Sequence, residues 1–147
     1  MTAGALGRDD LGFLLAKAMQ RWNELLADSF ARAGYADVRP SYGSVLLPLF
    51  EEDGLQMGEL ARRSRLSKQT MTALIRRVER DGLVSRRADP SDARATLIFL
   101  TERARLFEPV AGGVLRELDR AVRYRLTPAE VANVKEALRE LMALDLS

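Results

Sequence analysis

Apolar side chains recur at helical spacing over a long stretch near the start of the chain. The stretch begins after Asp9 and Asp10, whose side chains can cap a helix, and continues until Gly34. Its apolar positions are Leu11, Leu14, Leu15, Ala18, Met19, Trp22, Leu25, Leu26 and Phe30. The pattern predicts a long amphipathic first helix.

A shorter apolar pattern follows in "SYGSVLLPLFEEDG". It predicts a second helix that begins with Ser41 as its cap and closes at Gly54, where glycine adopts a left-handed conformation at little cost. Pro48 lies inside this pattern. Because proline lacks the backbone N–H and clashes with the preceding turn, we expect a kink or an early helix end there. The acidic run at 51–53 is expected to be a solvated helix end.

Two helices joined by a short turn are predicted next, from "MGELARRSR" and from "SKQTMTALIRRVERDG", the longer one capped by Ser67 and ended by Gly82. This arrangement is a helix-turn-helix. Arg65 occupies the turn position that usually holds glycine, which costs on the order of 1 kcal/mol if its φ is positive. The residues expected to bury the pair are Leu60, Ala61, Leu66, Met71, Leu74, Ile75 and Val78.

The stretch "LVSRRADPSDARATLIFL" contains two runs with the alternation of strands, separated by "ADPSD". Proline and acidic residues are typical of a tight turn, so we expect a β-hairpin that projects beyond the longer helix as a wing. Asp89 and Asp92 would accept backbone N–H bonds in the turn and hold the Arg94 side chain. An arginine held in this way suits a narrow minor groove. The alternative is a surface hairpin whose arginines only solubilise it.

Two more helices complete the chain. Thr101 is expected to cap the first of them, and Pro109 predicts a bend in its first half. "TPAE" at 127–130 predicts the start of the final helix through a capping box and a proline at its first position. We find no repeat or flexible linker, so the sequence predicts a single domain, 1–147, that is mainly α with a small β-wing.

Positive charge is concentrated in the helix-turn-helix and the wing. From Arg62 to Arg94 there are ten basic residues against four acidic ones, a net charge of +6, whereas the whole chain carries +2. This asymmetry favours a polyanionic partner, although a well-solvated helix face remains the alternative. An α-helix fits the major groove of duplex DNA, where glutamine can pair with adenine and arginine with guanine.

The residues predicted to contact DNA lie on the outer face of the longer helix, beside it and on the wing. Taken singly, each also fits an ordinary exposed side chain: the threonines need no ligand, and Arg76 and Arg80 could pair with Glu79 or Asp81. The predicted set is Arg62, Arg63, Ser67, Lys68, Gln69, Thr70, Thr72, Arg76, Arg77, Arg86, Arg87 and Arg94.

The segment "GELARRSRLSKQTMTALIRRVERDGLVSRRADPSDARATLIFLTERA" resembles the MarR family of bacterial transcriptional regulators, most specifically in "ERDGLV" and "DPSDAR" followed by "LT". The resemblance spans nearly the whole chain. Two residues depart from the family pattern. Arg65 stands at the turn glycine, and Gln56 stands where a helix-capping Ser or Thr is commoner. The resemblance implies a homodimer with dimerisation helices in 1–34 and 101–147, and a winged helix-turn-helix in 41–100 that grips a near-palindromic operator. Apolar terminal helices on a small domain support a partner surface independently.

The resemblance also implies a small aromatic or anionic effector that resets the spacing of the two recognition helices. Trp22, Tyr42 and Phe50 are the candidate residues for its cleft, and the alternative is that they belong to the core. No cofactor and no metal site are expected.

Other classes of function have less support. The chain has neither cysteine nor histidine, which excludes thiol and imidazole chemistry, and it has no glycine-rich phosphate loop. We therefore expect no enzyme activity. Neither a signal peptide nor a membrane span is predicted, so the expected location is the cytoplasm. A winged helix that binds other proteins remains a further alternative, although such an interface would favour exposed aromatic residues over this charge density.

Overall fold

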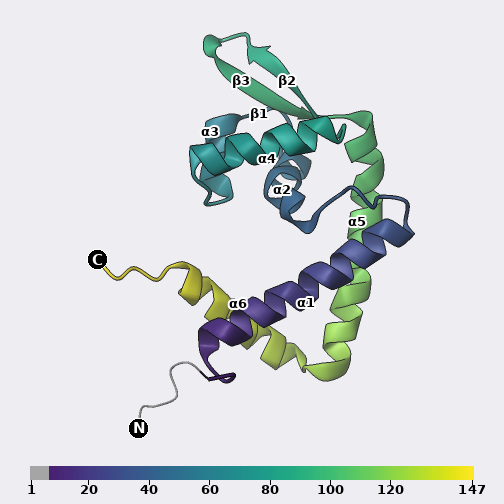
Figure 1. The fold of residues 1–147 in the computed structure, drawn as a ribbon, viewed down its shortest axis with the longest axis vertical. Helices are drawn as coiled ribbons and strands as arrows, with labels where there is room; N and C mark the ends of the chain where they lie inside the picture. Colours follow the sequence, from purple (N-terminus) through teal and green to yellow (C-terminus); the bar gives the residue numbers. More distant parts are fainter. Residues whose placement is uncertain (1–6) are drawn as a thin grey trace. The chain divides into compact units, whose positions relative to one another are not determined.

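The computed structural model describes residues 7–147, so the first six residues of the predicted 1–34 dimerisation segment lie outside the described part (Figure 1). The fold is mainly α with a small antiparallel sheet, as predicted. The chain forms two compact units, one through Ala111 and one from Gly112. In chain order the elements are α1 (Leu11–Arg32), the 3-10 helix η1 (Pro40–Tyr42), α2 (Gly43–Glu51), β1 (Leu55–Gln56), α3 (Met57–Arg63), α4 (Lys68–Arg80), β2 (Val84–Asp89), β3 (Asp92–Leu100), α5 (Glu102–Arg125) and α6 (Pro128–Met142).

Helix α1 begins and ends where its sequence signals predict. The Asp10 carboxylate accepts the Phe13 N–H at 3.3 Å, and Gly34 follows the helix with a φ of +95°. Its last turns contact the rest of the first unit, where Phe30 meets Phe107 edge-on with ring centroids 4.9 Å apart. Most of the apolar side chains of its first half are exposed, in contrast to Leu26 and Phe30.

Helix α2 differs from its prediction at both ends. Ser41 lies inside η1 and caps nothing, because α2 begins at Gly43 without a side-chain cap. The helix ends at Glu51, before Gly54. The helix continues through Pro48, so it does not end at the proline as expected, and the kink that was the alternative stays a prediction. Pro48 has no N–H for the carbonyl of Ser44, and the Ser64 hydroxyl at the end of α3 donates to that carbonyl instead.

The sheet has the order β1-β3-β2, with all pairs antiparallel. Strand β1 was missed in the sequence, and it pairs Leu55 with Ile98. Gly54 precedes it with a φ of +72°, and a Cβ at this position would lie 2.8 Å from the Phe99 ring. Glycine is therefore required there both for the backbone conformation and for the close approach of Phe99.

The core of the first unit lies between α2, α3, α4 and one face of the sheet. Leu49, Leu60, Met71, Ile75 and Ile98 are fully buried in it. Burial of each such side chain stabilises the fold by about 1.5–3 kcal/mol. This core fixes α4 and the base of the wing as parts of one structure, and the hairpin of β2 and β3 extends beyond α4 (Figure 1).

The second unit contains the later part of α5 and the whole of α6. Thr127 and Glu130 form the predicted capping box, and Pro128 is at the first helical position. No residue of α6 is buried. Helix α5 is helical through Pro109, and the predicted bend there stays a prediction. Within residues 7–147, none of the helices has the length and apolar character needed to span a membrane.

Candidate nucleic-acid interface

The turn between α3 and α4 has the positive φ at Arg65 that was expected to cost stability. Arg65 has a φ of +56°. Among residues 7–147, every other residue with a positive φ is a glycine. The Leu66 N–H then returns to the Ala61 carbonyl at 3.0 Å. The turn therefore keeps the geometry of a helix-turn-helix and tolerates the strain, at a cost of about 1–2 kcal/mol.

The first turn of α4 presents polar side chains to solvent. Ser67 caps the helix, with its hydroxyl accepting the Thr70 N–H at 3.1 Å. Lys68 and Gln69 are exposed next to it, and Ala73 and Arg76 continue the same exposed surface. Met71, Leu74, Ile75 and Val78 face the core. The predicted division of α4 into a buried and an outer face is confirmed.

The hydroxyl groups on this helix differ in what they can offer a ligand. The Ser67 hydroxyl donates to Thr70 Oγ1 at 2.9 Å, which leaves the hydrogen of Thr70 free to point outward. Thr72 is half-buried, and its Oγ1 lies 2.8 Å from the Lys68 carbonyl, to which it donates. Thr70 can therefore donate to a ligand, whereas Thr72 can only accept.

Several of the predicted DNA-contacting arginines already have acidic partners. Arg62 and Arg63 both donate to Glu59 at 2.9 Å, and Arg63 also donates to Glu52 at 2.9 Å. These two arginines lower the pKa of Glu59 to about 2. Arg86 donates to Glu79 at 2.9 Å, which joins the first half of β2 to the end of α4. Exposed ion pairs of this kind contribute about 0–1 kcal/mol, so a phosphate can displace them.

A second group of cations makes no ion pair within residues 7–147. All of its members are exposed, and they lie on α4 and on the wing. This group is Lys68, Arg76, Arg77, Arg87 and Arg94. The structure thus separates cations that are available at once from cations that must first exchange a carboxylate.

The tip of the wing is held by its two aspartates, partly as predicted. Asp89 accepts the Ser91 N–H at 2.9 Å and the Ser91 hydroxyl at 2.8 Å. Asp92 accepts the main-chain N–H of Arg94 at 3.0 Å. The expected ion pair from the Arg94 guanidinium is not formed in the described residues, because Asp92 binds the backbone of Arg94 and not its side chain. The arginine is held at its main chain and its guanidinium is exposed.

The outer side of the wing carries an arginine stacked on an aromatic ring. The Arg87 guanidinium lies 4.4 Å from the centroid of the Phe99 ring, and the same ring packs over Gly54. Such stacking orients the guanidinium while its N–H groups stay free for a ligand.

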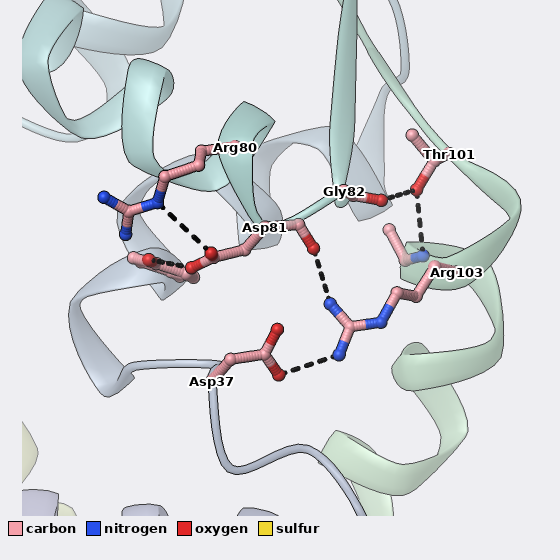
Figure 2. A network of polar contacts seen from close by, with 8 residues as sticks. Asp37, Arg80, Asp81, Gly82, Thr101 and Arg103 are labelled. Carbon is pink, nitrogen blue, oxygen red and sulfur yellow. Dashed lines mark hydrogen bonds and ion pairs between the residues drawn. The ribbon is translucent and has the colours of Figure 1, made fainter.

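The C-terminal end of α4 is fixed by a network of polar contacts (Figure 2). Arg103 donates to the Asp81 carbonyl at 2.6 Å and to the Asp37 carboxylate at 2.7 Å. The Asp81 carboxylate accepts the Tyr42 hydroxyl at 2.5 Å, and this bond, followed by the contact with Arg80, holds the pKa of Asp81 below its usual range. Thr101, the predicted cap of α5, donates to the Gly82 carbonyl at 2.6 Å.

The three candidate effector residues lie in different environments. Tyr42 is 2% exposed and is occupied by Asp81, and burial together with that bond raises its pKa. Trp22 is 37% exposed on α1, and Phe50 is half-buried at the end of α2. Tyr42 therefore has a structural role, which leaves the two others as candidates.

Several acidic residues that bond to the sheet or to arginines of the site were not predicted in these roles from the sequence. Asp53 accepts the Leu100 N–H at 2.8 Å and the Arg105 guanidinium at 2.6 Å, so the acidic run at 51–53 is more than a solvated helix end. Glu59 was not singled out as the partner of Arg62 and Arg63, and Glu79 pairs with Arg86 instead of Arg76 or Arg80. The spacing of Glu59 to Arg62 and Arg63 is the i,i+3 and i,i+4 spacing of helical ion pairs, which could have indicated this contact.

Comparison with known sequences places this site in a family. The MarR family model matches residues 40–96. The HTH-type transcriptional regulator TtmR of Methylorubrum extorquens is 44% identical over 61 residues, 42% of this chain and 31% of TtmR. The HTH-type transcriptional repressor Rv2887 of Mycobacterium tuberculosis is 34% identical over 93 residues, 63% of this chain and 67% of that protein. The transcriptional activatory protein BadR of Rhodopseudomonas palustris is 42% identical over 53 residues, 36% of this chain and 30% of BadR.

Solved structures of transcriptional regulators share the fold of this chain. A probable transcriptional regulator from Pseudomonas aeruginosa has a TM-score of 0.79 at 27% identity, covering 90% of this chain and 97% of that one. PcaV from Streptomyces coelicolor, solved with its natural ligand, has a TM-score of 0.79 at 21% identity and coverages of 97% and 96%. The S. aureus MepR–DNA complex has a TM-score of 0.77 at 19% identity and coverages of 90% and 96%. The last two show a shared fold.

Fold and site therefore define a winged helix-turn-helix protein. With the family model and the Rv2887 match, the chain belongs to the MarR family of transcriptional regulators. The chain spans about a third of the length of TtmR and BadR, and about two thirds of Rv2887.

Proposed function

We propose that this protein is a homodimer that binds a near-palindromic operator in duplex DNA and represses transcription by occupying the promoter. The observation that carries this proposal is the group of exposed cations on α4 and the wing that make no ion pair within residues 7–147, namely Lys68, Arg76, Arg77, Arg87 and Arg94. They lie on the outer face of α4 and on the wing, the two elements that a winged helix presents to DNA.

The proposed contacts divide into two kinds. Lys68, Gln69 and Thr70 at the start of α4 contact base edges in the major groove, with Thr70 as a donor and Thr72 as an acceptor. The exposed guanidinium of Arg94 enters the neighbouring minor groove. Phosphate contacts position the protein and supply most of its affinity. They come from Ser67, Arg76, Arg77 and Arg87 directly, and from Arg62, Arg63 and Arg86 after each has exchanged its glutamate for a phosphate.

The dimer is supported by apolar side chains that this chain leaves exposed. On α1, Leu11 is 56% exposed and Met19 is 60% exposed, and on α6, Leu138 is 41% exposed. A monomer would leave these helices in contact with water, and burial in a two-fold interface removes that cost. Such a dimer places its recognition helices about one turn of DNA, roughly 10 base pairs, apart.

Repression is favoured over activation by the match to Rv2887, which is named a repressor and aligns over more of this chain than the activatory protein BadR. We also propose a small aromatic or anionic effector that releases the operator; PcaV, which shares this fold, was solved with its natural ligand. Trp22 and Phe50 are the residues that we propose for its site, since Tyr42 is bonded to Asp81. A regulator of this kind acts in the cytoplasm, where its operator lies.

A titration with fluorescent random-sequence duplex at increasing salt tests the DNA-binding proposal. We expect binding at low ionic strength that weakens steeply with salt, and a dimer by sedimentation. The matched variant replaces Arg76 and Arg77 by alanine and should reduce the salt dependence by about two charges. Folded, dimeric protein that binds no duplex at low salt would refute the proposal. Selection of bound sequences from the random pool then gives the operator, and transcription from that operator with and without protein separates repression from activation.

A further inference from the structure

The side chain of Gln56 connects the start of α3 to the tip of the wing. Gln56 is the N-cap residue of α3, but it makes no side-chain cap bond to that helix. Its Nε2 instead donates to Asp89 Oδ2 at 2.9 Å, across 33 positions of the sequence. The side chain of Gln56 therefore bonds to the wing and does not cap α3.

Asp89 is the residue through which such a contact can act on the wing. It is the last residue of β2 and is 9% exposed. Its Oδ1 accepts the Ser91 N–H and hydroxyl of the turn, and its Oδ2 accepts Gln56. The two carboxylate oxygens therefore have different partners. Oδ1 bonds within the turn, and Oδ2 connects the turn to the residue that precedes α3. A carboxylate this little exposed needs both sets of partners.

The wing needs an attachment at this point because the sheet narrows towards the tip. Strand β1 pairs with β3 only at Ile98 and Leu97, so the remainder of the hairpin has two strands. An isolated two-stranded hairpin is marginally stable in water. The register also shifts between Ala88 and Asp89, directly before the turn that leads to Arg94. Gln56 lies outside the hairpin, so its bond to Asp89 adds to the bonds that the hairpin and its turn make within themselves.

We propose that Gln56 is a positioning residue for DNA recognition, which fixes the wing tip through Asp89 and thereby fixes the place of the Arg94 guanidinium. This inference rests on the proposed function, in which Arg94 contacts DNA. The partner is duplex DNA. Loss of the Gln56 contact is expected to weaken the DNA contact of the wing and to leave the major-groove contacts of α4 unchanged.

Amide hydrogen exchange of the free protein tests the attachment without DNA. Gln56→Met keeps the length of the side chain and removes the donor, and it should accelerate exchange of the Ser91 and Arg94 amides by about tenfold. Gln56→Lys keeps an N–H donor and should restore slow exchange. Gln20→Met, which removes an exposed amide on α1, is the matched control. Unchanged exchange at the wing tip in Gln56→Met would overturn the inference.

Gln56→Ser separates positioning from a merely structural role. Serine is a preferred N-cap, so this variant should keep or raise the melting temperature while it still accelerates exchange at the tip and weakens operator binding. A purely structural role for Gln56 predicts that wing order and stability change together. If Gln56→Ser leaves the tip protected, the inference is wrong.

A double-mutant cycle links the attachment to DNA. In the wild-type background, Gln56→Met should weaken operator binding by about three- to tenfold; in the Arg94→Ala background it should cause no further loss. Equal losses in both backgrounds, or no loss in the first, overturn the link to Arg94. If the wild-type protein binds no DNA, the proposed function fails, and the exchange experiment still decides whether Gln56 holds the wing.

Discussion

The hydroxyl of Tyr42 lies 2.5 Å from Oδ2 of Asp81, so a buried tyrosine of η1 donates to the residue that ends the recognition helix α4. Arg103 donates to the main-chain carbonyl of the same aspartate. The end of α4 is therefore held from two sides, by a side chain that precedes α2 and by one that belongs to α5. The direction of α4 depends on these contacts as well as on the apolar core.

Removing the Tyr42 hydroxyl should lower stability in a pH-dependent manner. Tyr42→Phe leaves Asp81 without its main partner and should lower the free energy of unfolding by about 1–2 kcal/mol near neutral pH, measured by urea titration. The folded-state pKa of Asp81 lies below its ordinary value of 3.8. Its contribution is therefore complete above that value and is lost as the pH falls through the folded-state pKa. The difference between wild type and Tyr42→Phe should narrow in acid, and a constant difference from neutral pH to pH 3 would contradict the assignment.

The strain at Arg65 can be measured with two substitutions. Arg65→Gly relieves the positive φ, whereas Arg65→Ala removes the side chain and keeps the strain. We expect the glycine variant to be more stable than the alanine variant by about 1 kcal/mol in urea unfolding, because only glycine adopts this conformation freely. Equal stability of the two would mean that the turn does not hold Arg65 in the left-handed region in solution.

Local signals were sufficient to predict most of the elements. Ser67 and Thr127 cap the helices that their sequences indicated, and the turn between Asp89 and Asp92 joins the two strands of the wing. These features depend on interactions within a few residues of the chain. Ser41 fails as a cap because Pro40 begins a 3-10 helix that includes it.

The features that were not predicted depend on contacts between distant segments. Strand β1 has only two residues, Leu55 and Gln56, and so no alternation marks it in the sequence. The contacts of Gln56 with Asp89 and of Glu79 with Arg86 require that the wing and the helices are already placed. Charge density therefore located the candidate interface, but it could not separate the paired arginines from the available ones.

Neutralising Glu59 should strengthen non-specific DNA binding. Glu59→Gln removes the charge that both Arg62 and Arg63 contact, so neither arginine has to exchange that partner for a phosphate. We expect tighter binding to random duplex at low salt, and a logarithmic salt dependence steeper by about one unit. Glu24→Gln, which removes an exposed carboxylate on α1, is the control. A slope unchanged from wild type would show that these arginines do not approach the DNA.

The role of Gln69 is tested by comparing two kinds of DNA. Gln69→Ala should weaken binding to the selected operator by about 1–3 kcal/mol and should weaken binding to random duplex much less, since a base contact is lost and no phosphate contact is changed. Both affinities can be measured by fluorescence anisotropy at one salt concentration. An equal loss on the two duplexes would mean that Gln69 does not contact base edges.

In the proposed interface, the wing contacts DNA through Arg94. Its guanidinium is exposed and its main chain is fixed by Asp92, so Arg94→Ala should leave folding intact and weaken operator binding by about ten- to a hundredfold. A narrow, A·T-rich minor groove attracts arginine most strongly, and the loss should therefore be greater on operators with an A-tract at the wing position than on those with G·C pairs there. Arg120→Ala removes an equal charge from α5 and controls for net charge. Operator affinity that matches wild type in Arg94→Ala, with an unchanged melting temperature, would exclude the wing arginine from the interface and leave recognition to α4 alone.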